Sequence, residues 1–322
     1  MAKIRIAAAA DDGYAQYLGV LIASILKTSE PGDEFSFYVV DGGITEVNRK
    51  KLLDLRRLKD FDIQWLSASF DQELADCPEV SYFSMNAYSR LLLPELMAQY
   101  DRVLYLDCDI VVNGSLAELW NTSLEGCSVG VVPDIGEIVR KNDRYRKRLN
   151  LMHTRLFNSG MLLLDLQQLR KNKRFKETIL WIAQHREEVS CPDQEGLNVI
   201  FQNDKKELSY RWNFNSKWDI AKSWTPAVYN RLMQINPDFT ASAANPVIIH
   251  YIGRKKPWHY AFTGGFSDLW LSMRQGTPWH ANGTPQPKTF CERIKKFLKG
   301  NVLVRTLRRR NRISILLKKD VG

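Results

Sequence analysis

Residues 102–113 read Arg-Val-Leu-Tyr-Leu-Asp-Cys-Asp-Ile-Val-Val-Asn. The apolar run from Val103 to Leu106 is typical of a buried strand in a parallel sheet. Asp107 and Asp109 follow where that strand should end, and alternation along an extended chain points both carboxylates to one side and Cys108 to the other. Buried carboxylates need a positive partner, and Mg²⁺, Mn²⁺ and Ca²⁺ all accept oxygen ligands. The stretch therefore predicts a strand that ends in a metal site.

Two other interpretations of the acid pair are open. The carboxylates would then either cap a turn or form an ion pair with Arg102. The spacing alone is common, because Asp60-Phe61-Asp62 has it too. That second pair follows a basic stretch rather than a strand, and we expect it to be solvated.

Strands and helices alternate along the first part of the chain. Strands are predicted at Ile4–Ala10, Phe35–Val40, Phe61–Leu66, Ser128–Val132, Met161–Leu164 and Val247–Tyr251. Helices are predicted from Tyr17 to Leu26, from an N-cap at Thr45 to Leu58, at Tyr88–Ala98, at Phe175–His185 and from Asp193 to Phe201. This pattern predicts an α/β fold with a Rossmann-like, mostly parallel sheet.

Ligands of such sheets bind outside the carboxyl ends of the strands. The polar segment from Asp11 to Tyr14 and the acid pair both fall at predicted carboxyl ends. The first strand is followed by no GxGxxG, and the chain has no GK[ST]. A dinucleotide or P-loop site therefore has no motif to support it.

A late segment, His250-Tyr251-Ile252-Gly253-Arg254-Lys255-Lys256-Pro257-Trp258, supplies groups that complement the acid pair. A neutral imidazole of His250 would complete the coordination of a metal, although a single histidine is more often a satisfied core residue. Gly253 lets the backbone approach a phosphate, and Lys256 offers a charge to it. The charged segment 134–154 is either a mobile lid or a solvated helix.

These blocks together resemble a known family. They are Ala9-Ala10-Asp11-Asp12-Gly13-Tyr14, Tyr88-Ser89-Arg90, Leu104 to Asp109, Phe157-Asn158-Ser159-Gly160, Asp193-Gln194 and His250 to Trp258. In this order they are similar to the family 8 retaining glycosyltransferases, especially the bacterial lipopolysaccharide α-galactosyl- and α-glucosyltransferases. The resemblance covers about residues 3–275 and implies a GT-A type fold.

The resemblance also implies roles for individual residues. Asp107, Asp109 and His250 would bind Mn²⁺, with Mg²⁺ as the alternative, and the metal would bridge the diphosphate of UDP-galactose or UDP-glucose. The other donor-binding residues would be Ala9, Ala10, Asp11, Gly13 and Tyr14 at the uridine and ribose, Cys108 in the acid turn, Gly253 and Lys256 at the diphosphate, and Arg90 and Asn158 at the sugar. Gln194 and Asp193 would be catalytic.

The family retains the configuration of the transferred sugar. Two displacements would require a carboxylate nucleophile, as in retaining glycosidases. The resemblance places Gln194 near the anomeric carbon, and an amide is a poor nucleophile, which favours front-face attack through an oxocarbenium-like state. Asp193 keeps the two-step alternative open.

The acceptor implied by the resemblance is a lipid-linked oligosaccharide, the lipopolysaccharide or lipooligosaccharide core. A transferase acting on another cell-surface glycan or a glycoprotein is an alternative. A sugar-1-phosphate nucleotidyltransferase is a weaker one, because such enzymes carry a Gly-rich loop with Arg and Lys where this chain has Asp11 to Tyr14.

The net charge of +10 is confined to one end of the chain. Residues 286–322 contain twelve Lys and Arg and two acidic residues, so the remainder carries 34 of each sign. The neutral remainder and the lack of a recognition motif argue against a specific nucleic-acid-binding protein. Phe290, Ile294, Phe297 and Leu298 fall on one face of a helix among basic residues, which predicts binding to an anionic membrane surface.

These observations divide the chain into a catalytic domain, residues 1–276, and a linker with a basic amphipathic tail, residues 277–322. Five scattered cysteines without a CxxC fit a reducing compartment, and neither a signal peptide nor a membrane-spanning run is evident. We therefore expect a cytoplasmic protein that associates peripherally with the cytoplasmic face of the inner membrane.

Overall fold

The computed structural model of the chain describes residues 3–68, 74, 76–78, 85–136, 143–151, 154–217, 226–259, 262 and 264–282. The predicted membrane-binding tail, residues 286–322, lies outside these ranges. Parts of the charged segment 134–154 also lie outside them.

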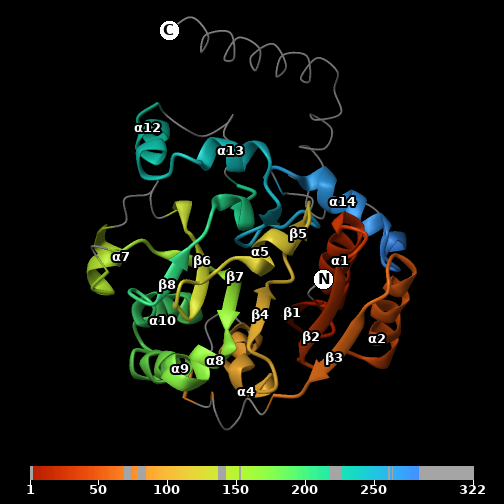
Figure 1. Cartoon of the computed structure of the whole chain (residues 1–322), viewed down its shortest axis with the longest axis horizontal. Helices are drawn as coiled ribbons and strands as arrows, with labels where there is room; N and C mark the ends of the chain where they lie inside the picture. Colours follow the sequence, from red (N-terminus) through yellow and green to blue (C-terminus); the bar gives the residue numbers. More distant parts are fainter. Residues whose placement is uncertain are drawn as a thin grey trace, which may run out of the picture.

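One large sheet organises the fold (Figure 1). Its seven strands lie in the order β3-β2-β1-β4-β7-β6-β8. Their bounds are β1 Lys3–Ala10, β2 Glu34–Asp41, β3 Asp62–Leu66, β4 Arg102–Leu106, β6 Val129–Pro133, β7 Phe157–Asp165 and β8 Lys205–Glu207. Neighbouring strands from β3 to β4 are parallel, β7 is antiparallel to β4 and β6, and β8 is parallel to β6. The predicted α/β fold with a mostly parallel sheet is confirmed.

A small second sheet begins directly after the acid pair. Its strands are β5 Ile110–Val112, β9 Phe214–Asn215 and β10 Ile248–His250, in the order β5-β10-β9. β10 is antiparallel to β5, and His250 lies opposite Ile110. β9 is parallel to β10, and Asn215 lies opposite His250. The chain therefore passes from one sheet to the other at Asp107–Asp109.

Helices cover both faces of the large sheet (Figure 1). The α-helices are α1 Ala15–Thr28, α2 Glu46–Leu53, α4 Leu93–Leu96, α5 Ala117–Asn121, α7 Asp143–Arg148, α8 Leu166–Asn172, α9 Arg174–Gln184, α10 Pro192–Ile200, α12 Pro226–Ile235, α13 Phe239–Ala244 and α14 Ser267–Gln275. The 3₁₀ helices are η1 Asp54–Arg57, η2 Met85–Leu92, η3 Tyr210–Trp212 and η4 His280–Asn282.

The core has two layers because alternate strand residues point to opposite faces. On β4, Leu104 and Leu106 pack in the layer that contains α1, whereas Val103 and Tyr105 pack in the layer that contains η2 and α8 to α10. Burial on both faces explains why β4 reads as a continuous apolar run. Trp279 packs closely against Gly19 of α1, so the packed body extends beyond the predicted boundary at residue 276.

Several predicted elements differ in detail. Thr45 is the N-cap of α2, as predicted, because its Oγ1 accepts from Asn48 N at 3.4 Å. The last turn of the predicted helix forms the 3₁₀ helix η1 and not α-helix. The helix predicted at Tyr88–Ala98 is wrong in type: η2 precedes the short α4, which begins around Pro94 because proline suits a first helical turn. Strand β7 is longer than the predicted Met161–Leu164 and starts at Phe157.

Within the part of the chain that the structure describes, no helix has both the length and the apolar composition needed to span a bilayer. Leu149 and Leu151 of the charged segment form a small buried cluster with Leu156, which follows the segment. Its described part is therefore packed on the protein at these leucines.

Candidate active site

The acid pair lies in a turn between β4 and β5. Asp107 N donates to Gly160 O of β7 at 2.9 Å, and Tyr251 N donates to Asp109 O at 3.0 Å. The Cys108 thiol points the other way and donates to Ala9 O of β1 at 3.2 Å. The two carboxylates therefore lie on the side opposite Cys108, as predicted, although the segment is a turn and not the extended strand that the prediction assumed.

His250 meets the acid pair because β10 pairs with β5. Its Nε2 lies 3.0 Å from Asp109 Oδ1 and 3.9 Å from Asp107 Oδ2. One ligand atom from each of these three residues lies within 4.8 Å of the others. The three metal ligands implied by the sequence are thus brought together from two sheets.

The chemistry of this cluster fits a divalent cation. Asp109 Oδ1 is buried and has no hydrogen-bond partner, a cost that a metal bond would remove. Burial acts to raise the pKa of Asp109, but His250 and Lys256 outweigh it and hold that pKa well below its ordinary value. The carboxylate is therefore ionised, as a ligand to Mn²⁺ or Mg²⁺ must be.

A missing side chain makes room for the cluster. A Cβ on Gly160 would lie 2.7 Å from Asp107 Oδ2 and 2.8 Å from His250 Nδ1. Real Cβ atoms do not approach so closely, so residue 160 must be glycine for the histidine and the carboxylate to occupy these positions.

Arg90 is a buried cation beside the acid pair. Its Nη2 lies 3.0 Å from Asp107 Oδ1, its Nη1 lies 3.5 Å from Asp193 Oδ2, and Nη1 donates to Ser159 O at 2.5 Å. Burial acts to lower the pKa of Arg90, but Asp107 and the other nearby acidic groups outweigh burial. The net effect is that the pKa of Arg90 lies above its ordinary value. The alternative in which the acid pair binds Arg102 is wrong, because that guanidinium donates to Trp120 O instead.

Asp193 and Gln194 lie in the first turn of α10. Asp193 is 3% exposed, accepts from Ser159 Oγ at 2.9 Å, and has its pKa raised by burial. Gln194 Oε1 accepts from Asn158 Nδ2 at 2.9 Å and from Ser159 N at 3.3 Å. Both residues implied to be catalytic are therefore held against the start of β7, within contact of Arg90 and Asn158.

The loop after β1 lies beside the acid turn because β1 and β4 are adjacent parallel strands. Ala9 and Ala10 end β1, and Tyr14 N then donates to Asp11 Oδ1 at 2.9 Å. Asp12 fixes the loop to α2, since its Oδ1 accepts from Thr45 N at 2.9 Å and Asn48 Nδ2 at 2.8 Å. A Cβ at Gly13 would lie 3.3 Å from Asp11 Oδ1, a contact that a small shift of that carboxylate would relieve.

Tyr14 is exposed, as is the neighbouring Gly13. Its side chain is 44% exposed, and partial burial of the phenol together with the nearby Asp109 carboxylate raises its pKa to about 12. The phenol of Tyr14 therefore lies near the acid pair.

The loop after β10 folds back over the acid turn. Lys256 Nζ donates to Asp109 Oδ2 and, at 2.8 Å, to Tyr251 O. Gly253 adopts φ +92°, which favours glycine, and its Cα faces Lys217 Nζ. The Trp258 ring stacks on Tyr17 of α1 at a centroid distance of 3.8 Å. Lys256 thus lies on the acid pair itself.

Sequence reasoning missed several residues of this site. Asn213 of the loop before β9 contacts both His250 and Asn158, Tyr105 OH donates to Asp107 Oδ1 at 2.8 Å, and Ser159 holds Asp193. Asn213 is 5% exposed between Trp212 and Phe214. A polar residue between buried aromatics is the signal that indicates such a role.

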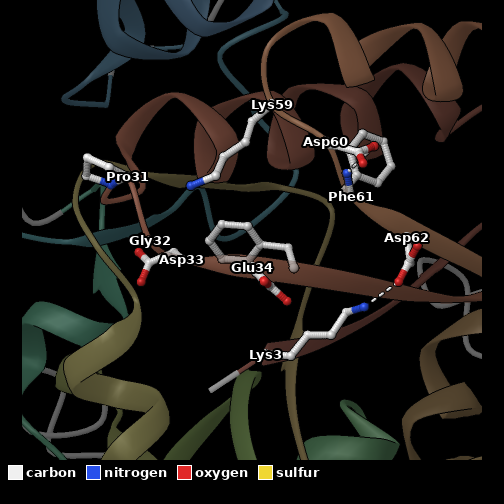
Figure 2. A pocket seen from close by; sticks show the side chains of 10 residues that line it. Lys3, Pro31, Gly32, Asp33, Glu34, Lys59, Asp60, Phe61 and Asp62 are labelled. Atoms are coloured by element: carbon white, nitrogen blue, oxygen red, sulfur yellow. Dashed lines mark hydrogen bonds and ion pairs between the residues drawn. The ribbon is translucent and has the colours of Figure 1, made fainter. Parts of the chain in front are cut away.

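A second hollow lies at the opposite end of the sheet (Figure 2). It measures about 630 Å³ and is lined at the amino ends of β1, β2 and β3 by Lys3, Glu34 and Asp62 among others. Its lysines are already paired: Lys3 with Asp62, and Lys59 with Ser29 Oγ and Glu30 O. Parallel sheets bind ligands at their carboxyl ends, so the residues around the acid pair remain the candidate active site.

Comparisons with known proteins identify the family to which this chain is similar. The glycosyl transferase family 8 model matches residues 5–261. The chain is 29% identical over 287 residues to general stress protein A of Bacillus subtilis (strain 168), covering 88% of this chain and 96% of that protein. It is 25% identical over 298 residues to a lipopolysaccharide 1,2-glucosyltransferase of Escherichia coli (strain K12), covering 91% and 84%.

A solved structure shares both fold and sequence. The galactosyltransferase LgtC, determined in complex with donor and acceptor sugar analogs, superposes with a TM-score of 0.73 at 28% identity, covering 87% of this chain and all of that one.

Proposed function

The chain belongs to glycosyl transferase family 8, and on that premise we propose that it moves galactose or glucose from a UDP-sugar to a saccharide acceptor with retention of configuration. The observation that carries the proposal is the meeting of Asp107, Asp109 and His250 at the carboxyl edge of the sheet. A Mn²⁺ or Mg²⁺ ion held there would neutralise the diphosphate as it leaves the sugar.

The protein's own groups supply the rest of the donor site. We assign uridine and ribose to the β1 loop, where Ala9, Ala10, Asp11, Gly13 and Tyr14 lie next to Cys108. The diphosphate is assigned to Gly253 and Lys256. A lysine at this position stabilises the negative charge that accumulates on the departing UDP.

The sugar is assigned to the space beside Arg90, Asn158 and Gln194. Asp193 is buried and already accepts from Ser159 Oγ, with Arg90 on its other side. Those contacts disfavour Asp193 as a nucleophile and leave Gln194 as the residue that faces the reacting carbon. This supports front-face attack over a two-step double displacement.

We propose that the acceptor is a lipid-linked oligosaccharide of the lipopolysaccharide or lipooligosaccharide core type, at the cytoplasmic face of the inner membrane. Relatives with lipopolysaccharide glucosyltransferase names support this acceptor. The second candidate is a transferase acting on another cell-surface glycan or a glycoprotein, because other matched relatives have names without an acceptor. Residues 286–322 would hold the enzyme at the anionic surface.

The test combines UDP release and product structure. The purified chain with Mn²⁺, UDP-galactose or UDP-glucose and a truncated core oligosaccharide should release UDP and form an α-linked product by NMR. Chelation by EDTA and the substitution Asp109→Asn should each abolish release. Asp60→Asn is the matched control, because Asp60 has the same acid spacing but a side chain that is 95% exposed. A β-linked product, or full activity of Asp109→Asn in EDTA, would contradict the proposal.

A further inference from the structure

A chain of side-chain amides connects His250 to Gln194. Gln194 Oε1 accepts from Asn158 Nδ2 at 2.9 Å, and Asn158 Oδ1 accepts from Asn213 Nδ2 at 3.0 Å. Asn213 Oδ1 then lies 3.0 Å from His250 Nδ1. Asn213 and His250 are 5% and 3% exposed, so water does not compete for the bond between these two side chains.

Backbone N–H groups fix the direction of every amide in this chain. Gly160 N can only donate, and it donates to Asn158 Oδ1 at 3.1 Å. Ser159 N likewise donates to Gln194 Oε1 at 3.3 Å. Asn158 must therefore present oxygen to Asn213, and Asn213 must present oxygen to His250. An oxygen acceptor at Nδ1 requires that the proton of the imidazole lie on Nδ1.

This proton position has a consequence at the acid pair. With Nδ1 protonated, Nε2 of the neutral ring carries a lone pair 3.0 Å from Asp109 Oδ1, an oxygen that has no hydrogen-bond partner among the described residues. Two facing acceptors need a cation between them. The other tautomer would place N–H on Nε2, and the ring would then have no lone pair there for a metal.

We infer that Asn213 is a positioning residue that fixes His250 in the tautomer able to bind a metal, and that Asn158 transmits the same orientation to Gln194. The inference rests on the proposed function, because the metal is the one that the transferase would use. It explains why a buried asparagine stands between two aromatic residues in the segment leading into β9.

The first test measures Mn²⁺ binding by electron paramagnetic resonance, without nucleotide and without turnover. Asn213→Leu should weaken Mn²⁺ binding by roughly ten- to a hundred-fold, the usual cost of losing a residue that orients a metal ligand. Asn213→Asp keeps an oxygen acceptor for Nδ1 but loses the N–H that Asn158 Oδ1 accepts, so it should restore only part of the affinity. Asn215→Leu is the matched control, since Asn215 lies in the adjacent β9, is 9% exposed and bonds to Lys217 N instead of His250.

The second test reads the tautomer directly. ¹⁵N NMR of the histidine-labelled, metal-free wild-type protein, at a pH where the imidazole is neutral, should show the proton of His250 on Nδ1, with His250→Gln used for assignment. Asn213→Leu should lose this preference, and a fold check by circular dichroism accompanies each variant.

The outcomes separate the two proposals. A wild-type His250 that carries its proton on Nε2 overturns the inference, even if Asn213→Leu fails to fold. Equal Mn²⁺ affinity in wild type and Asn213→Leu, or an equal loss in Asn215→Leu, also overturns it. A wild-type protein that binds no Mn²⁺ while the Nδ1 proton is observed would instead refute the metal in the proposed function and leave the tautomer assignment standing.

Discussion

At the scale of single residues, the candidate metal site has no room for a side chain at Gly160. The absent Cβ leaves room for Asp107 Oδ2 and the His250 ring. We predict that Gly160→Ala will weaken Mn²⁺ binding strongly and cost about 1–3 kcal/mol of unfolding free energy, since overpacking a filled site forces its neighbours to move.

Isothermal titration with Mn²⁺ and urea unfolding measure the two effects. Gly114→Ala is the control, because the added carbon there meets only the Val247 side chain at 3.3 Å. Metal affinity in Gly160→Ala equal to wild type would show that His250 and Asp107 are not constrained by this glycine.

Arg90 is the buried charge that stabilises two carboxylates. It is 4% exposed and lies between Asp107 and Asp193. We predict that Arg90→Met will lower the free energy of unfolding by about 3–5 kcal/mol, because removing one member of a buried ion pair leaves uncompensated charge.

The double variant Arg90→Met with Asp193→Asn should recover part of that loss in urea unfolding, since one buried carboxylate is then neutral. Arg102→Met, which loses only the bond to Trp120 O, should cost much less. If Arg90→Met were as mild as Arg102→Met, the ion-pair assignment would fail.

At the scale of elements, local pattern predicted the strands that carry their own signal. The apolar runs of β1 and β4 and the Thr45 cap of α2 are visible in a few consecutive residues. The antiparallel direction of β7 is not, because it depends on which strands become neighbours. The two-residue β9 has no periodicity to detect, and its neighbour Asn213 was missed with it.

The features of the candidate site also fall into those that local sequence predicts and those that it does not. Charged and glycine residues at strand ends were predictable, since the carboxyl edge of a parallel sheet gathers them. The Lys256–Asp109 pair and the Asn213–His250 bond were not, because they join segments more than thirty residues apart in the chain.

Strand β8 carries a lysine whose charge opposes folding. Lys205 Nζ donates to Thr154 Oγ1 at 2.8 Å and Arg155 O at 2.9 Å, and burial lowers its pKa to about 8 from 10.5 although Glu207 opposes the shift. Between these values the unfolded chain binds the proton more tightly than the folded protein. Stability should therefore rise with pH across that window, with the penalty fully present below it.

We predict that this rise will be missing in Lys205→Met. Urea unfolding of both proteins from about pH 7 to about pH 10 gives the difference between them, which isolates this lysine from the other groups that titrate there. Lys206→Met, which alters a surface ion pair with Glu125, should keep the wild-type slope. If the stability of Lys205→Met showed the wild-type pH dependence, a group other than Lys205 would be responsible for the rise.

At the scale of the whole molecule, the site exists because two sheets meet. The acid turn joins β4 of the large sheet to β5 of the small one, and β10 of the small sheet brings His250 to it. Arg90 from η2 and Gln194 from α10 approach from the layer that covers the large sheet. The candidate active site therefore depends on long-range packing.

The separation of charge along the chain leads to a prediction about where the enzyme works. Outside residues 286–322 the numbers of basic and acidic residues are equal, so the twelve Lys and Arg of this tail carry the excess. Each basic residue near an anionic leaflet contributes about 1 kcal/mol, so a third of them would hold a neutral body at the surface. We predict that a chain ending at residue 285 will no longer sediment with anionic liposomes but will still transfer sugar to a short soluble acceptor. Liposomes of neutral lipid are the control and should bind neither protein. Equal sedimentation of the truncated and full chains with anionic liposomes would place the membrane contact on the catalytic body.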